Sequence, residues 1–218
     1  GTEEETDDAL RSRFYETFNV AAFGGNLSSY RNEILAIEGV GAVQVYPAWK
    51  GGGTVLCSIL GDDLRPALSA TVQKVQSIIC PSEEGGSTPS PSGYGIAPIG
   101  AAVTITTGTA LTLNITCDID FVETMLNGVE TYQEQIEEKI QEYLDTLCKA
   151  WGDPLKAHQI TYAVTVYASR IIYSILTIQD VVNVSNVKIN GVGGDLKLAE
   201  SAELQQVPVL GTVVINGE

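Results

Sequence analysis

The sequence is poor in the residues on which most metal sites and disulfide scaffolds depend. Its 218 residues include a single histidine, His158, and four cysteines that form no Cys-x-x-Cys pair. Zinc sites are built from closely spaced cysteine and histidine ligands, so we expect no metal site. The wide spacing also gives no disulfide framework, so we predict that every thiol is reduced and buried or half-buried, as in proteins made in the cytoplasm. These cysteines are Cys57, Cys80, Cys117 and Cys148.

Positive charge and long apolar runs are also scarce. Twelve lysines and arginines stand against 27 acidic residues, which gives a formal net charge of −15. A chain of this charge repels polyanions, so we expect no nucleic-acid partner. No run approaches the roughly eighteen apolar residues of a membrane span, and no signal peptide opens the sequence, so we expect a soluble protein with no membrane partner.

The chain does contain enough apolar residues to fold. They make up 44% of the sequence and charged residues 18%, which is typical of globular proteins. Gly1 followed by "TEEETDD" looks like the scar of an expression vector, so we expect a longer protein that continues upstream. Three Asn-x-Ser/Thr sequons have no significance unless the protein is secreted, and nothing indicates secretion.

The first half of the sequence predicts three helices and a hairpin. Apolar residues recur at helical spacing after Thr6 and again after Ser28 or Ser29, which are candidate N-caps. Two β-rich runs separated by a Lys-Gly-Gly-Gly turn indicate a hairpin, and Pro66 suits the first turn of a further helix. The expected elements are helices over 6–18, 28–37 and 66–80 and strands over 40–49 and 53–60.

A stretch rich in glycine, serine and proline, residues 82–95, separates this half from the next. Gly93, Gly95 and Gly100 resemble a phosphate-binding loop in composition only, because that loop needs a strand before it and a helix N-terminus after it. Here a predicted helix precedes and a predicted strand follows. We therefore interpret the stretch as a connector that leads into a long bent strand.

The second half repeats the same kinds of element. Alternating apolar residues over 101–120, broken by Gly108, predict a long strand, and the following apolar stripe predicts a long amphipathic helix over 125–147. Strands are expected over 160–167, 181–189 and 207–215, with a helix capped by Ser169 between the first two.

The two halves also share a short pattern. Residues 34–43 match residues 175–184 at five of ten positions, and Ser28 falls opposite Ser169 in the same register. The pattern is a capped helix that leads into a strand, although many helix-to-strand junctions use Ile, Leu and Val. We predict an α+β fold of two similar layered modules, residues 1–98 and 99–218, with helices packed on mostly antiparallel sheets.

No group of residues has the spacing of a catalytic site. Asp118 and Asp120 are the one pair worth inspecting, since alternate residues of an extended segment share a face and two carboxylates could act as acid and base or hold a hard cation. Polar residues at a turn are the simpler and preferred explanation. His158 follows turn residues, and Lys149 beside Cys148 is a commonplace neighbour. We expect no cofactor.

Aromatic residues near turns are candidate interaction sites. Tyr46, Trp49 and Lys50 lie at the end of the predicted hairpin, and Trp151 follows the long helix. Tyrosine and tryptophan in such places often anchor contacts between proteins, but they also pack over a protein's own core.

Several segments together resemble the baseplate J family of contractile-tail wedge proteins, as in phage Mu and prophage elements. They are "ETDDALRSRFYETF", "AFGGNLSSY", "EGVGAVQVYPAW" with "GGGTV", "GYGIAPIGAAVTI" and "VPVLGTVVI", and their order is that of the family over nearly the whole chain. The serine- and proline-rich connector is longer than the family pattern leads us to expect. Family members are also longer at the N-terminus.

The resemblance implies a structural protein of the virion baseplate, made in the bacterial cytoplasm, with no catalytic residue to carry over. The implied partners are other baseplate wedge and tail proteins, with a homo-oligomer in the assembled baseplate. The alternative is a tail-associated hydrolase or glycan-binding module that uses Asp118 and Asp120.

Overall fold

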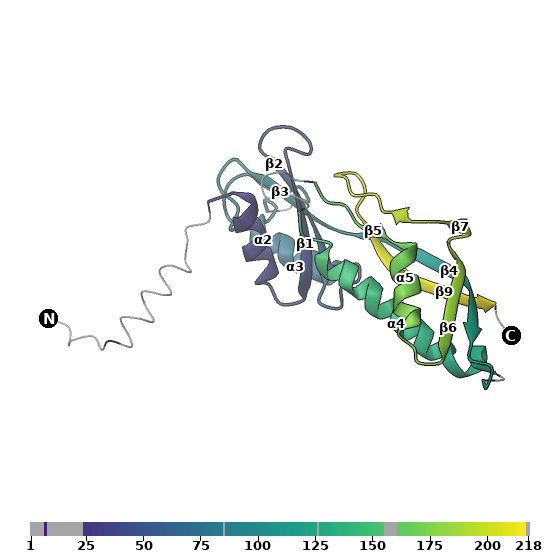
Figure 1. The fold of residues 1–218 in the computed structure, drawn as a ribbon. Helices are drawn as coiled ribbons and strands as arrows, with labels where there is room; N and C mark the ends of the chain where they lie inside the picture. The colour runs from purple at the N-terminus through teal and green to yellow at the C-terminus, as the bar shows by residue number, and fades with distance from the viewer. Residues whose placement is uncertain (1–6, 8–23, 85, 126, 155–160, 217–218) are drawn as a thin grey trace.

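The fold is α+β, as the sequence predicts. The computed structural model describes residues 7, 24–84, 86–125, 127–154 and 161–216. Within them the strands form a three-stranded, a four-stranded and a small two-stranded sheet, and helices pack on the two larger sheets (Figure 1). The elements are α2 (Leu27–Leu35), β1 (Val40–Pro47), β2 (Thr54–Gly61), α3 (Ser69–Ile79), β3 (Ala102–Thr107), β4 (Thr109–Phe121), α4 (Gly128–Ala150), β5 (Thr165–Val166), α5 (Ala168–Leu176), β6 (Val181–Ile189), β7 (Val192–Gly193), β8 (Leu196–Lys197) and β9 (Gln206–Asn216).

The first sheet has the strand order β1-β2-β3. Strands β1 and β2 form the predicted antiparallel hairpin, whereas β3 pairs parallel to β2. A parallel neighbour needs a crossover connection, which α3 supplies on its way from β2 to β3. Residues 102–107, which the sequence analysis placed in the second module, therefore complete the first sheet, which has one antiparallel and one parallel pairing.

The first sheet contributes to two hydrophobic cores because successive strand residues point to opposite faces. On one face Val43, Val45 and Ile59 pack with residues of α2 and α3. On the other face Ala42 and Leu60 belong to the core of the second sheet. The two parts of the chain therefore share β1 and β2 as a common layer.

The second sheet has the order β7-β6-β4-β9, with α4 contacting β9 and α5 contacting β6. Its longest pairing, between β4 and β9, is parallel, and β4 pairs antiparallel with β6. The long strand expected over 101–120 is thus two strands, one in each sheet. They separate at Gly108, where an added Cβ would lie 2.6 Å from Val207 Cγ2, so a larger residue here would displace that side chain.

The helix-to-strand pattern shared by the two halves has the same geometry in both places. After α2, the amide of Ile37 donates to Ile34 O at 3.1 Å and that of Val40 donates to Ile37 O at 3.2 Å. After α5, the equivalent bonds are repeated from Ile178 and Val181, at 3.0 and 3.2 Å. Each nine-residue helix therefore ends in the same turn and leads into a strand that it covers.

Three local predictions differ from the structure. Asn26, and neither Ser28 nor Ser29, caps α2, because its side chain accepts from Ser29 N at 2.9 Å. Helix α5 begins at Ala168 after Tyr167, with no side-chain cap, so Ser169 lies inside it. The strand expected over 160–167 is reduced to β5. The helix expected over 6–18, apart from Asp7, and His158 lie outside the described residues.

No described helix has both the length and the apolar character that a membrane crossing requires.

Candidate interaction surfaces

The loop of the β1–β2 hairpin presents two of the predicted interface residues. Lys50 Nζ lies 4.2 Å from the centre of the Trp49 ring, a cation–π contact at the surface. The loop is ordered: Ala48 N donates to Thr54 O at 2.7 Å, and Lys50 N donates to Thr54 Oγ1 at 3.0 Å. It projects beyond the end of the sheet (Figure 1). Trp49 and Lys50 are therefore held in place where a neighbouring protein could contact them.

The other two predicted interface residues lie inward. Tyr46 is half-buried, with its ring 5.3 Å from that of Tyr162. Trp151 is fully buried, and its indole N–H donates to Gln206 O at 2.9 Å. Of the two roles that the sequence left open for Trp151, the structure favours packing in the protein's own core, because the turn after α4 brings the ring into the second core.

A polar cluster that sequence reasoning did not find lies where the first sheet meets the second module. Gln44 of β1 is fully buried, and its amide nitrogen donates to Trp151 O at 2.8 Å and to Glu200 Oε2 at 2.7 Å. Its amide oxygen accepts from the Tyr46 hydroxyl at 2.7 Å. Every hydrogen-bonding position of this buried amide that needs a partner is thus filled.

The neighbouring contacts reinforce the same junction. Tyr162 Oη accepts from Val45 N at 2.8 Å, at the free edge of β1. Arg31 of α2 donates to the carbonyl of Gly152 and forms an ion pair with Asp153 at 2.7 Å. These bonds join the first module to the end of α4.

Burial at this junction raises the pKa of Glu200 to about 7. Loss of solvent around the carboxylate is the main cause, and the hydrogen bond from Gln44 acts in the opposite direction. The carboxyl group therefore titrates near neutral pH.

Asp118 and Asp120 lie on the solvent-facing side of β4, and amides already bind their carboxylates. Asp118 accepts from Asn186 Nδ2 and from Asn216 Nδ2, the first at 2.5 Å and the second at 3.0 Å. Asp120 accepts from Asn183 Nδ2 at 3.0 Å. The bonds from Asn186 and Asn216 hold the pKa of Asp118 below its ordinary value. An exposed carboxylate kept ionised in this way is poorly suited to act as a general acid.

The four cysteines are free and buried. Burial raises the pKa of the Cys117 and Cys148 thiols to about 11 and also raises that of Cys57. These thiols remain protonated at neutral pH and are poor nucleophiles. Among the described residues, no group of three or more histidine, cysteine or acidic side chains is placed to hold a metal ion.

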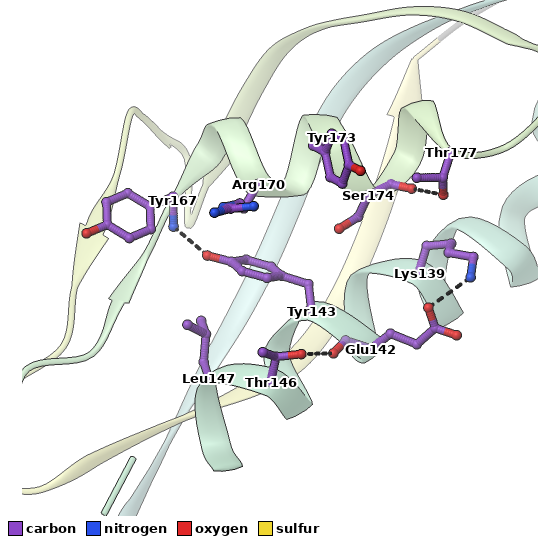
Figure 2. Close-up of a pocket in the computed structure, with 10 residues that line it drawn as sticks. All are labelled: Lys139, Glu142, Tyr143, Thr146, Leu147, Tyr167, Arg170, Tyr173, Ser174 and Thr177. Carbon is purple, nitrogen blue, oxygen red and sulfur yellow. Dashed lines mark hydrogen bonds and ion pairs between the residues drawn. The ribbon is translucent and has the colours of Figure 1, made fainter. Parts of the chain in front are cut away.

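A groove of about 660 Å³ runs between α4 and α5 (Figure 2). Tyr143 and Leu147 of α4 line one side, and Tyr167, Arg170 and Tyr173 line the other. The groove is ordered at its centre, where the amide of Tyr167 donates to Tyr143 Oη at 2.9 Å. Lys139, at one end, forms an ion pair with Glu142 at 2.8 Å. The sequence analysis did not predict this groove, because its two sides come from helices that are separate in the chain.

Comparison with known proteins defines the class of protein to which this fold belongs. Residues 22–107 match the family described as Baseplate J-like central domain, a segment that ends with the last residue of β3. This match confirms, over these residues, the resemblance to the baseplate J family that the motifs predict.

Two relatives from Bacillus subtilis (strain 168) match almost the whole chain. One is named "Phage-like element PBSX protein XkdT", with 29% identity over 99% of this chain, and the other "Uncharacterized protein YqbT", with 31% identity over 99% of this chain. The chain spans 55% of the length of each relative.

The fold also resembles that of a solved protein. A chain of the structure titled "Cryo-EM structure of the anti-feeding prophage (AFP) baseplate, 6-fold symmetrised" aligns over 94% of this chain and 42% of its own length, with a TM-score of 0.51 and 13% identity. At this identity the likeness concerns the fold.

Proposed function

We propose that this protein is a structural component of a contractile-tail baseplate in a phage or prophage element, where it joins wedge subunits through protein–protein contacts. The observation that carries the proposal is the match of residues 22–107 to the Baseplate J-like central domain. Two names support it: one relative is named as a protein of a phage-like element, and the solved neighbour belongs to a prophage baseplate. Its place would be the virion baseplate, after synthesis in the bacterial cytoplasm.

We further propose that it works without catalysis or a cofactor. The alternative, a tail hydrolase or glycan-binding module, would depend on Asp118 and Asp120, whose carboxylates lie on an open sheet face and are already bound by asparagine amides. A net charge of −15 favours protein partners over nucleic acid. No observation favours a membrane partner.

The modular division supports an assembly role. We propose two modules that meet near Gly108, later in the chain than the expected boundary at residue 98, since the first sheet and the family segment both end at Thr107. The shared layer and the Gln44 cluster would keep the modules in one orientation and so space their outer surfaces for neighbouring subunits.

The hairpin loop offers a direct test. The Trp49→Ala variant should weaken co-sedimentation with the baseplate proteins encoded beside this one by about tenfold or more if Trp49 is a central anchor. Circular dichroism should show an unchanged fold, because Trp49 is only half-buried and lies in a loop outside the two cores. Leu68→Ala, a change at a side chain that is 76% exposed, is the matched control and should bind as the wild type does. A wild-type chain that binds none of these proteins would contradict the assembly role.

A further inference from the structure

The α4–α5 groove differs in charge from the chain that contains it. The chain carries a net charge of −15, yet the groove holds Lys139 and Arg170 with Glu142 as its one acidic residue. Glu142 is paired with Lys139 at 2.8 Å, and Arg170 has no ion pair with any carboxylate in the described part of the chain. Arg170 extends over the groove between Tyr167 and Tyr173 (Figure 2). The groove is thus a cationic site on an acidic protein.

The same groove exposes large aromatic side chains. Helix α5 buries Ile171 and Ile175 against the core. Among the residues that line the groove, Tyr173 of α5 is 64% exposed and Tyr167, just before α5, is 46% exposed. Tyrosines beside an arginine are the composition of the energetically dominant centres of protein interfaces. The groove therefore suits a partner segment that offers carboxylates together with apolar side chains.

We propose that the occupant is the segment of residues 2–18 of a second copy of this chain, an inference that rests on the proposed baseplate role. This segment begins with the densest acidic run in the sequence and continues with apolar residues at helical spacing, which complements the groove in both respects. The acidic residues are Glu3, Glu4, Glu5, Asp7 and Asp8, and the apolar ones are Leu10, Phe14 and Phe18.

The choice of a second copy follows from symmetry. The solved baseplate with a similar fold is six-fold symmetrised, so in such an assembly each chain is repeated by rotation about one axis. In sequence this segment precedes α2, which packs on the first sheet, whereas α5 packs on the second (Figure 1). A contact from the start of one chain to α5 of the next is head-to-tail, and contacts of that kind form a ring when the rotation between copies closes, as six-fold symmetry does.

Sedimentation equilibrium of the intact chain at low salt tests the proposal. The wild type should self-associate with a dissociation constant below about 1 mM, and added salt should weaken the association. Arg170→Glu should raise the dissociation constant about tenfold or more, because it places like charges together. Lys188→Glu, the same charge change at an exposed position of β6, is the matched control and should leave the dissociation constant within about twofold of the wild type.

A charge exchange between molecules identifies the occupant. In a variant with Glu3, Glu4 and Glu5 changed to lysine, the segment is basic and the groove is unchanged, so this variant should not self-associate. When it is mixed with the Arg170→Glu variant, its basic segment should bind the groove in which a glutamate replaces the arginine. Four outcomes would overturn the proposal: no self-association of the wild type, association that Arg170→Glu leaves unchanged, equal weakening by Lys188→Glu, or no binding in the mixture. If self-association fails while the chain still binds neighbouring baseplate proteins, only this inference falls. If both fail, the proposed function falls with it.

Discussion

At the scale of single residues, the junction between the modules depends on a buried amide and a carboxyl group. Gln44 uses its amide nitrogen for Trp151 O and Glu200 Oε2, while its oxygen accepts from Tyr46. A buried polar group is costly unless it is bonded, so these partners must meet in one arrangement. The cluster therefore fixes the orientation of the first sheet on the second module. Apolar contacts such as that of Ala42 are not directional and do not fix the orientation by themselves.

The raised pKa of Glu200 predicts a stability that depends on pH. Its ordinary value is 4.5 and its value in the fold is about 7, so the folded chain holds a proton that the unfolded chain releases. The free energy of unfolding should therefore fall as pH rises from about 4.5 to about 7, by about 1–2 kcal/mol, since the side chain is partly exposed and the effect is screened. Urea unfolding at a series of pH values measures this.

Glu200→Gln keeps the shape of the side chain without the titration, and it should flatten the pH dependence in this range. Glu203→Gln is the control, because Glu203 is exposed. It should preserve the wild-type slope. If the free energy of unfolding of the wild type stays constant between these pH values, the pKa of Glu200 is not raised by its burial.

At the scale of elements, side chains close the free edges of the strands. Gln76 of α3 accepts from Ile105 N at 2.8 Å and donates to Val103 O at 2.9 Å, along the outer edge of β3. Gln133 of α4 donates to Val213 O at 3.0 Å, on β9. Edges covered in this way resist the addition of a strand from another chain. Loops and helix faces, such as the hairpin loop and the α4–α5 groove, are left as the surfaces for partners.

Gly152, just after the end of α4, lies against the backbone of β1, and this contact predicts that a substitution by alanine lowers the stability. An added Cβ at Gly152 would lie 2.7 Å from Val43 O and 3.0 Å from Val43 N, so the backbone itself must move. Gly152→Ala should lower the free energy of unfolding by about 2 kcal/mol, the typical cost of overpacking. Urea denaturation of both proteins gives the difference.

Gly193→Ala provides the comparison for that measurement, because an added Cβ there has no neighbour within 4 Å among the described residues. Its effect should stay within about 0.5 kcal/mol. Equal stabilities for the two variants would show that α4 and β1 separate more easily than their contact implies.

At the scale of the whole molecule, the two cores share a layer. Ala42 and Leu60 belong to one core, while Val43 and Ile59, their neighbours in the same strands, belong to the other. Loss of either core would therefore expose one face of β1 and β2. A layer common to both cores couples their stabilities, so the modules differ from domains joined only by a linker.

This coupling predicts that the described fold unfolds in one transition. In a Trp49→Phe variant the remaining tryptophan, Trp151, reports on the second core alone. Its fluorescence and the far-ultraviolet circular dichroism of the whole chain should change at the same urea concentration. Two separate midpoints would contradict the coupling and would indicate that the modules unfold independently.

The sequence by itself determined the kinds of element, the α+β class and the family, because periods of 2.0 and 3.6 residues and glycine turns are local properties. The hairpin β1–β2 and helices α3 and α4 lie close to where these patterns predict them. The repeated turn after α2 and α5 was visible for the same reason, as a match of neighbouring residues.

Only the tertiary structure decided which surfaces are buried and which elements meet. Gln44 and Trp151 are 107 positions apart, so no local pattern indicates that one bonds to the other. The same holds for the split of the long strand at Gly108 between two sheets, and for the groove between α4 and α5. The sequence left the role of Trp151 open because its burial depends on β9, which follows it in the chain and whose Gln206 accepts from the indole.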